Sequence, residues 1–113
     1  MHKLLNEILK AWSAERRPTK EALENTELLL GRLNPLALLP SEADIGYWPT
    51  VELIWTDSPV QVEVFDYGYE IAVYPPYGAN FVYEIHEFHN GALKELDHVV
   101  TKLSLLLARD YDL

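Results

Sequence analysis

The sequence predicts an α+β fold in which helices cover one face of an antiparallel sheet. Apolar residues alternate with other residues over positions 51–88, and in the flanking segments they recur every three or four positions. Period two is typical of strands with two different faces, whereas the longer period is typical of amphipathic helices. Because helices and strands are segregated along the chain, we expect one α+β domain over residues 1–113.

Residues 1–33 are predicted to form a helical hairpin. The first helix runs from His2 to about Glu15 and ends before Pro18, because the residue preceding a proline avoids helical geometry. Thr19 occupies the N-cap position of a second helix, which continues to Leu33. Two helices with so short a link should lie antiparallel. The connector over residues 34–50 is rich in prolines and apolar residues, so we expect an ordered loop that packs across the domain.

The segment 51–88 is predicted to be a four-stranded antiparallel meander, because turn-forming residues at 57–59, 66–68 and 75–80 divide it. One face is almost entirely apolar and should be buried; the other mixes glutamates with apolar side chains. A slip of one residue in any strand would exchange its faces. The predicted buried face holds Val51, Leu53, Trp55, Val60, Val62, Val64, Tyr69, Ile71, Val73, Phe81, Tyr83 and Ile85. The predicted outward face holds Glu52, Ile54, Thr56, Gln61, Glu63, Phe65, Glu70, Ala72, Tyr74, Val82, Glu84, His86 and Phe88.

A third helix is predicted over residues 92–109, after His89-Asn90-Gly91. It is the longest and most apolar of the helical segments. We therefore expect this C-terminal helix to pack on the buried face of the sheet.

The net charge of −9 is unevenly distributed. No lysine or arginine lies between Leu33 and Leu93, whereas that span contains nine acidic residues. Direct binding to nucleic acid or to an anionic membrane is disfavoured there, because phosphate contacts need basic side chains. A basic protein partner is favoured. An acidic surface that serves solubility alone is the alternative.

The outward sheet face is the main candidate site, because large apolar groups lie among its carboxylates. A basic partner, intramolecular cover by the second helix or the connector, and a homodimer are three ways to cover it. Glutamates facing glutamates would oppose the homodimer. The predicted partner-binding residues are Glu52, Glu63, Phe65, Glu70, Tyr74, Glu84 and Phe88.

Two further sites are weaker hypotheses. An aromatic ligand pocket between sheet and connector would be lined by Trp48, Trp55, Tyr69 and Tyr83. A metal could be held only by Glu84, His86 and His89, which is fewer ligands than a zinc site usually has. No catalytic motif is present, so we expect neither an enzyme nor a cofactor.

The absence of cysteine and of an apolar run of about 20 residues favours a cytoplasmic location. The leading hypothesis is a non-enzymatic acidic protein that captures and blocks a basic, nucleic-acid-binding partner such as a nuclease. Immunity proteins, antitoxins and inhibitors of defence nucleases act in this general way. The alternative is a small-molecule-binding or sensory domain that uses the aromatic pocket.

Overall fold

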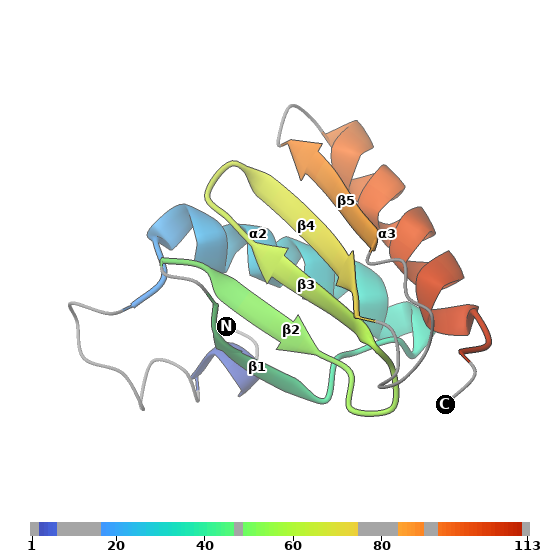
Figure 1. Cartoon of the computed structure of the whole chain (residues 1–113). Coiled ribbons are helices and arrows are strands. Elements are labelled where there is room, and N and C mark those ends of the chain that lie inside the picture. The colour runs from blue at the N-terminus through green and yellow to red at the C-terminus, as the bar shows by residue number, and fades with distance from the viewer. Residues whose placement is uncertain (1–2, 7–16, 47–48, 75–83, 90–92, 112–113) are drawn as a thin grey trace.

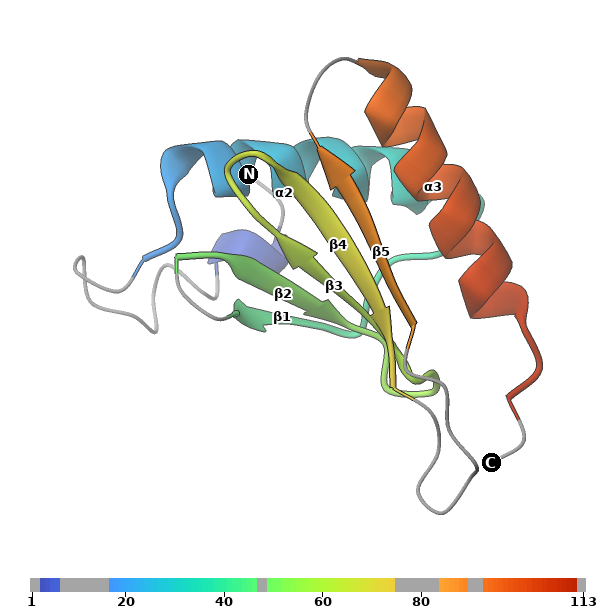
Figure 2. The same ribbon diagram turned by 45° about the horizontal axis from the view of Figure 1, so that its top comes forward.

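The computed structural model describes residues 3–6, 17–46, 49–74, 84–89 and 93–111. Helices α2 (Lys20–Leu33) and α3 (Leu93–Ala108) lie on one side of a five-stranded antiparallel sheet (Figures 1 and 2). The other side of the sheet, called the open face below, is turned toward the viewer in Figure 1. The predicted α+β class is confirmed.

The sheet is a meander in which each strand pairs with the next strand in the chain. Its number of strands differs from the prediction, because the connector contributes one. The additional strand has a short period-two pattern: Ala43 and Ile45 pack on the core, while Glu42 and Asp44 are exposed. The strands are β1 (Glu42–Ile45), β2 (Val51–Ile54), β3 (Val60–Val64), β4 (Gly68–Val73) and β5 (Glu84–His89).

Helix α2 confirms the predicted second helix, including its N-cap. The side chain of Thr19 accepts a hydrogen bond of 3.1 Å from the backbone N–H of Ala22. A short 3-10 turn, Asn34–Leu36, follows the helix. Of the predicted first helix, residues 3–6 are helical and Leu5 is fully buried, while the rest of that helix lies outside the described residues.

The core lies between the sheet and the two helices. The predicted inward residues of β2, β3 and β4 are all buried, and α3 presents Val99, Leu103 and Leu106 to them. Because α2 packs on this same side, the second helix does not cover the open face, and that alternative is ruled out. The connector contributes β1 at the edge of the sheet, while Tyr47 and Trp48 lie outside the described residues.

The faces of β5 are the reverse of those predicted. Ile71 pairs with His86 and Ala72 pairs with Ile85, so Glu84, His86 and Phe88 are on the helix side. Ile85 is on the open face, where its side chain is 43% exposed. A strand at the sheet's edge tolerates polar side chains on its inner face, because they can reach solvent or a helix end there. Glu84 does so by pairing with Arg109 beyond the end of α3.

A buried asparagine joins α2 to the turn between β3 and β4. The side-chain amide of Asn25 donates to the backbone carbonyls of Phe65 and Asp66, at 3.0 and 3.2 Å. The hydroxyl of Tyr69 donates to the backbone carbonyl of Asn25 at 2.7 Å, and burial raises the pKa of Tyr69 to about 12. These bonds fix the position of the turn relative to the helix.

Candidate functional site

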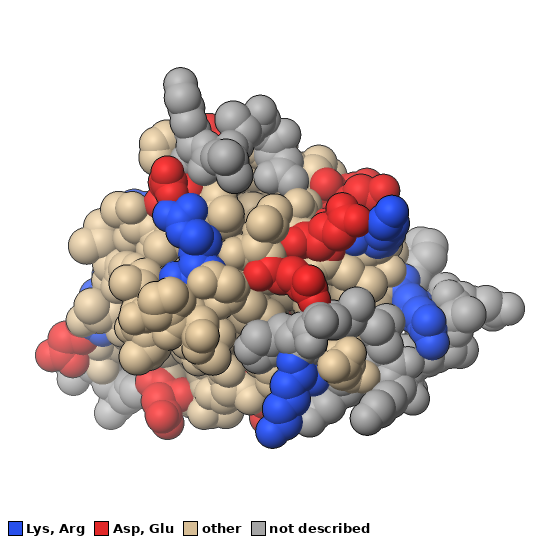
Figure 3. All heavy atoms as spheres, turned by 180° about the vertical axis from the view of Figure 1, so that it is seen from behind, with Lys and Arg blue, Asp and Glu red and all other residues tan. Residues whose placement is uncertain are grey.

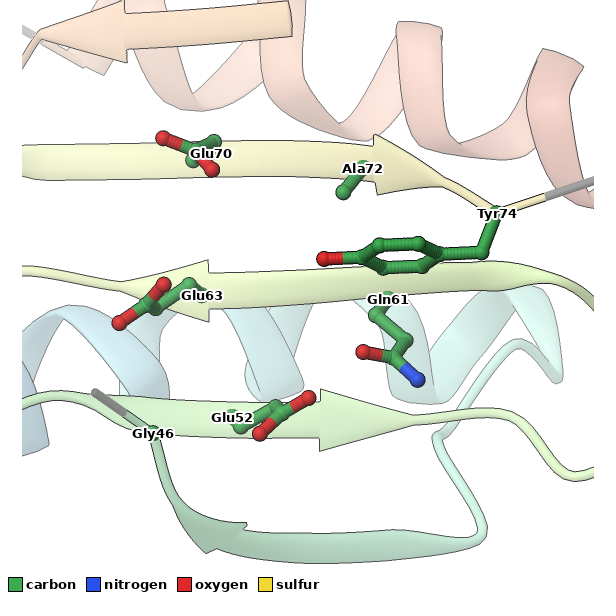
Figure 4. A pocket seen from close by; sticks show the side chains of 7 residues that line it. All are labelled: Gly46, Glu52, Gln61, Glu63, Glu70, Ala72 and Tyr74. Carbon is green, nitrogen blue, oxygen red and sulfur yellow. The ribbon is translucent and has the colours of Figure 1, made fainter. Parts of the chain in front are cut away.

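Five acidic residues form a continuous row across the open face, one from each strand. Asp44 is directly opposite Glu52, Glu52 is opposite Glu63, Glu63 is opposite Glu70, and Glu70 is opposite Glu87. Neighbouring strands are about 4.8 Å apart, so neighbouring carboxylates carry their charges at close range. We call these five residues the acidic row; Figure 4 shows its three central members.

The row carries an electrostatic cost within the folded protein. Burial, followed by the charges of Glu63 and Asp44, raises the pKa of Glu52. Burial, followed by the charges of Glu63 and Glu87, raises the pKa of Glu70. Neither Glu52 nor Glu70 forms an ion pair with a lysine or arginine in the described part of the chain.

Basic side chains lie instead on the helical side, where Figure 3 shows them next to acidic ones. Arg32 pairs with Asp97, and Arg109 pairs with Glu84. Like charges directly opposite one another destabilise a sheet. The open face therefore has an arrangement that folding alone does not favour.

Removing charge from the row should stabilise the protein. For Glu52→Gln/Glu70→Gln we expect the free energy of unfolding at pH 7 to rise by about 1 kcal/mol, because cross-strand repulsion is relieved. A raised pKa means that the folded state binds the proton more readily than the unfolded chain. The wild type should therefore gain stability from these groups as pH falls from 7 toward the ordinary glutamate value of 4.5, and the variant should gain less.

Urea denaturation at several pH values measures this effect. The control is Asp57→Asn/Asp110→Asn, which removes the same charge at two exposed positions outside the row. An equal gain in the control would show that total charge, rather than the row, is responsible.

The central carboxylate is held in place by a close approach of the chain. The hydroxyl of Thr50 donates to Glu63 at 2.6 Å, and Gly46 lies against both residues. A Cβ atom at Gly46 would be 2.4 Å from the Thr50 hydroxyl and 3.0 Å from the Glu63 carboxylate. Glycine at this position therefore allows the hydrogen bond that orients Glu63.

A hollow of about 490 Å³ lies over the middle of the open face. Figure 4 shows carboxylates of the acidic row along one side and the ring of Tyr74 lying along the sheet on the other, beside Ala72 and Gln61. The ring of Tyr74 is attached at the end of β4 and is well exposed. The hollow thus offers negative charge beside apolar surface. Its lining residues are Gly46, Glu52, Gln61, Glu63, Glu70, Ala72 and Tyr74.

Beside the part of the row on β3, β4 and β5, at the β3–β4 turn, is a stack of aromatic rings. The ring of Tyr67 stacks on Phe65, with centroids 4.9 Å apart, and on His89, with centroids 5.7 Å apart. Tyr67 is exposed, so this stack is a flat and accessible surface beside the charged row.

The structure brings together only part of the predicted partner-binding set. Glu52, Glu63, Glu70 and Tyr74 line the hollow, and Phe65 lies in the aromatic stack. Glu84 and Phe88 are on the helix side, and Phe88 packs on the core, so their predicted position on the outward face was wrong.

Sequence reasoning missed several residues of the open face. Asp44 was not predicted on this face because the segment that forms β1 was predicted to be a loop. Glu87 and Ile85 were not predicted there because the two faces of β5 are the reverse of those predicted. The alternation of acidic and apolar residues over positions 42–45 was the available signal for Asp44. The close approach of Gly46 had no signal in the sequence.

The predicted aromatic pocket is not assembled from the residues that are described. The Trp55 indole donates to the carbonyl of Leu38 at 2.9 Å, and Tyr69 is bonded to Asn25. Trp55 lines a shallow hollow beside the connector to which Tyr69 does not contribute. Trp48 and Tyr83 lie outside the described residues.

The predicted metal ligands are not brought together either. Glu84 and His86 are on the helix side with 3.2 Å between the carboxylate oxygen and Nε2, whereas His89 is on the open face. Within the described ranges, no three acidic or histidine side chains converge on one point. Glu84 is instead bonded to Arg109 and His86, which lower the pKa of its carboxyl group.

None of the helices in the described ranges is both long and apolar enough to cross a membrane. Comparison of the chain with protein-family models, with curated proteins and with solved structures gives no match.

Proposed function

We propose that this protein is a non-enzymatic acidic binding protein that captures a basic partner through the open face of its sheet. The acidic row is the observation that carries the proposal. Four successive strand pairs place like charges directly opposite one another, and a surface needed only for solubility could disperse the same charges at less cost. A partner that supplies cations would relieve this repulsion on binding.

The row also suggests what kind of partner is captured. Its charges follow one another at about 4.8 Å across the strands, and a DNA strand carries one charge per about 3.4 Å of helix axis. A surface that normally binds phosphates would therefore meet a comparable line of negative charge. We infer that the protein occupies and blocks a nucleic-acid-binding surface, as an immunity protein or an antitoxin would.

The charges should act mainly on the rate of association and on specificity, because charged surfaces steer encounter more than they add affinity. The aromatic stack of Phe65, Tyr67 and His89 offers apolar contact area alongside the row, at the β3–β4 turn. Tyr74 offers a second such area on the other side of the hollow. A homodimer through the same face is disfavoured by the repulsion between two acidic rows.

A pull-down with matched variants tests the proposal. The wild type should retain a basic nucleic-acid-binding protein from a lysate of the source cells, and Glu63→Lys/Glu70→Lys should lose it. Asp57→Lys/Asp110→Lys has the same net charge but leaves the open face intact, so it should retain the partner. Mass spectrometry identifies the retained protein.

A second measurement asks whether the partner is blocked. Labelled DNA or RNA bound to the purified partner should be displaced by the wild type and not by Glu63→Lys/Glu70→Lys. Equal retention by both double variants, or no displacement of nucleic acid, would contradict the proposal.

A further inference from the structure

A second row of side chains runs beside the acidic row on the open face. It is displaced by two residues along β2, β3, β4 and β5, and the same register places its members directly opposite one another; on β1 the corresponding position is the charged Glu42, opposite Ile54. Its four members carry no charge, and we call it the uncharged row; it consists of Ile54, Gln61, Ala72 and Ile85. Two residues of strand span about 6.7 Å, so the two rows are parallel and close together.

Of the uncharged row, Ile85 is exposed, Ile54 and Gln61 are half-buried, and Ala72 is buried beside the exposed ring of Tyr74. The side chain of Ile85 is 43% exposed, and Tyr74, which lies beyond Ala72, is 44% exposed. Exposed apolar groups next to a line of charge are typical of an interface that has both an apolar core and a charged rim. The apolar side chains of the uncharged row are an observation independent of the charges, and they indicate an occupant that carries apolar as well as basic side chains.

The length of the acidic row distinguishes between a helical and an extended occupant. The five members of the acidic row span about 19 Å, at about 4.8 Å per strand. Five side chains on one face of an α-helix, one per turn, span about 22 Å. Five side chains on one face of an extended chain span about 27 Å. The mismatch in length is about 3 Å for a helix and about 8 Å for an extended chain, so a helix matches the acidic row more closely.

The width of a helix also fits. An α-helix with its side chains is about 10–12 Å across, so it can cover two rows that are about 6.7 Å apart. A basic stripe would lie on the acidic row while an adjacent apolar stripe lies on the uncharged row.

The hollow where the two rows meet suits an arginine in particular. Its methylene groups can lie against Ala72 and the ring of Tyr74, while its guanidinium group reaches the carboxylates of Glu52, Glu63 and Glu70. A planar guanidinium group can bond two carboxylate oxygens at once, which the ammonium group of lysine cannot do with the same geometry.

We propose that the open face binds an amphipathic basic helix of the partner, laid across all five strands with an arginine in the central hollow. This inference rests on the proposed function, because it specifies the element of the basic partner that the acidic row receives.

Synthetic peptides test it without the natural partner. One 18-residue peptide carries arginines at every third or fourth position with leucines on the adjacent stripe. A second peptide has the same composition in an order that forms no stripe. Fluorescence anisotropy at physiological ionic strength should give at least tenfold tighter binding of the striped peptide. Its circular dichroism should gain helical signal on binding, and replacing its arginines with lysines should weaken binding several-fold.

Protein variants separate the two rows. Ile85→Ser should weaken binding of the striped peptide several-fold, whereas Leu105→Ser, at a position 65% exposed on α3, should not. Glu63→Lys/Glu70→Lys should abolish binding, and thermal melts confirm that each variant is folded.

Equal affinity for the two peptides, or binding without helical signal, overturns the helix inference. If such binding still depends on Glu63 and Glu70, the proposed function stands. If neither peptide binds, the helix inference is overturned, and the pull-down decides the proposed function separately. Peptide binding that is indifferent to charge reversal in the row contradicts both.

Discussion

Replacing Gly68 with alanine should destabilise the protein by about 3 kcal/mol, because the new methyl group has no space. Gly68 is opposite His89, and a Cβ atom there would be 1.9 Å from the backbone oxygen of Phe88. That oxygen belongs to the neighbouring strand, so β5 must move away or the turn before β4 must reshape. Either change would displace His89 from the aromatic stack. Urea denaturation measures the loss of stability.

The matched control is Gly31→Ala, the same substitution in α2. No atom lies within 4 Å of a Cβ atom at Gly31, and the position is exposed. Alanine favours a helix over glycine by about 1 kcal/mol, so this variant should be more stable than the wild type. A Gly68→Ala variant as stable as the wild type would show that β4 and β5 are not held as closely as described.

Replacing Asn25 with alanine should cost about 2–3 kcal/mol. The substitution removes two hydrogen bonds and leaves the carbonyls of Phe65 and Asp66 without their side-chain donor. It also leaves a small void beside Tyr69, whose hydroxyl is bonded to the backbone of the same residue. Because the turn carries Phe65 and Tyr67, binding of the striped peptide should weaken along with the stability.

Asn34→Ala is the control for this substitution. Asn34 is exposed at the end of α2, and its replacement should change the free energy of unfolding by less than about 0.5 kcal/mol. Amide hydrogen exchange gives a local measurement: the amides of the β3–β4 turn should lose protection in Asn25→Ala and keep it in Asn34→Ala. Unchanged protection in both would mean that Asn25 does not anchor the turn.

The helices and the inner faces of β2, β3 and β4 could be predicted because strong local signals agreed with burial. The capping threonine Thr19 marks the start of α2, and valines at every second position mark β3. In these segments one face is apolar and the other polar, so only one register buries the apolar set.

β1 and β5 could not be predicted with the same success, because both lie at the edges of the sheet. β1 has four residues, none of them fully buried, so its alternation of acidic and apolar residues is short. β5 alternates Glu84, His86 and Phe88 with Ile85, Glu87 and His89, and each set contains one apolar side chain. Its register is determined by hydrogen bonds to β4, which composition does not reveal.

The acidic row follows from this pairing. The sequence shows that acids are frequent and basic residues absent over the strands, which predicts an acidic surface. Whether the acids are dispersed or directly opposite one another depends on the register of four strand pairs, each of which must be known. Four of the residues lining the hollow were nonetheless predicted as partner-binding residues, because the faces of β2, β3 and β4 are those expected.

The acidic character of β1 has a consequence for self-association. As an edge strand, β1 offers unpaired backbone groups to which the edge of another sheet could add. Its two outward residues, Glu42 and Asp44, are exposed and negative, so a second copy approaching edge to edge would bring like charges together. The shortness and the charge of this strand thus protect the sheet from edge-to-edge growth into aggregates.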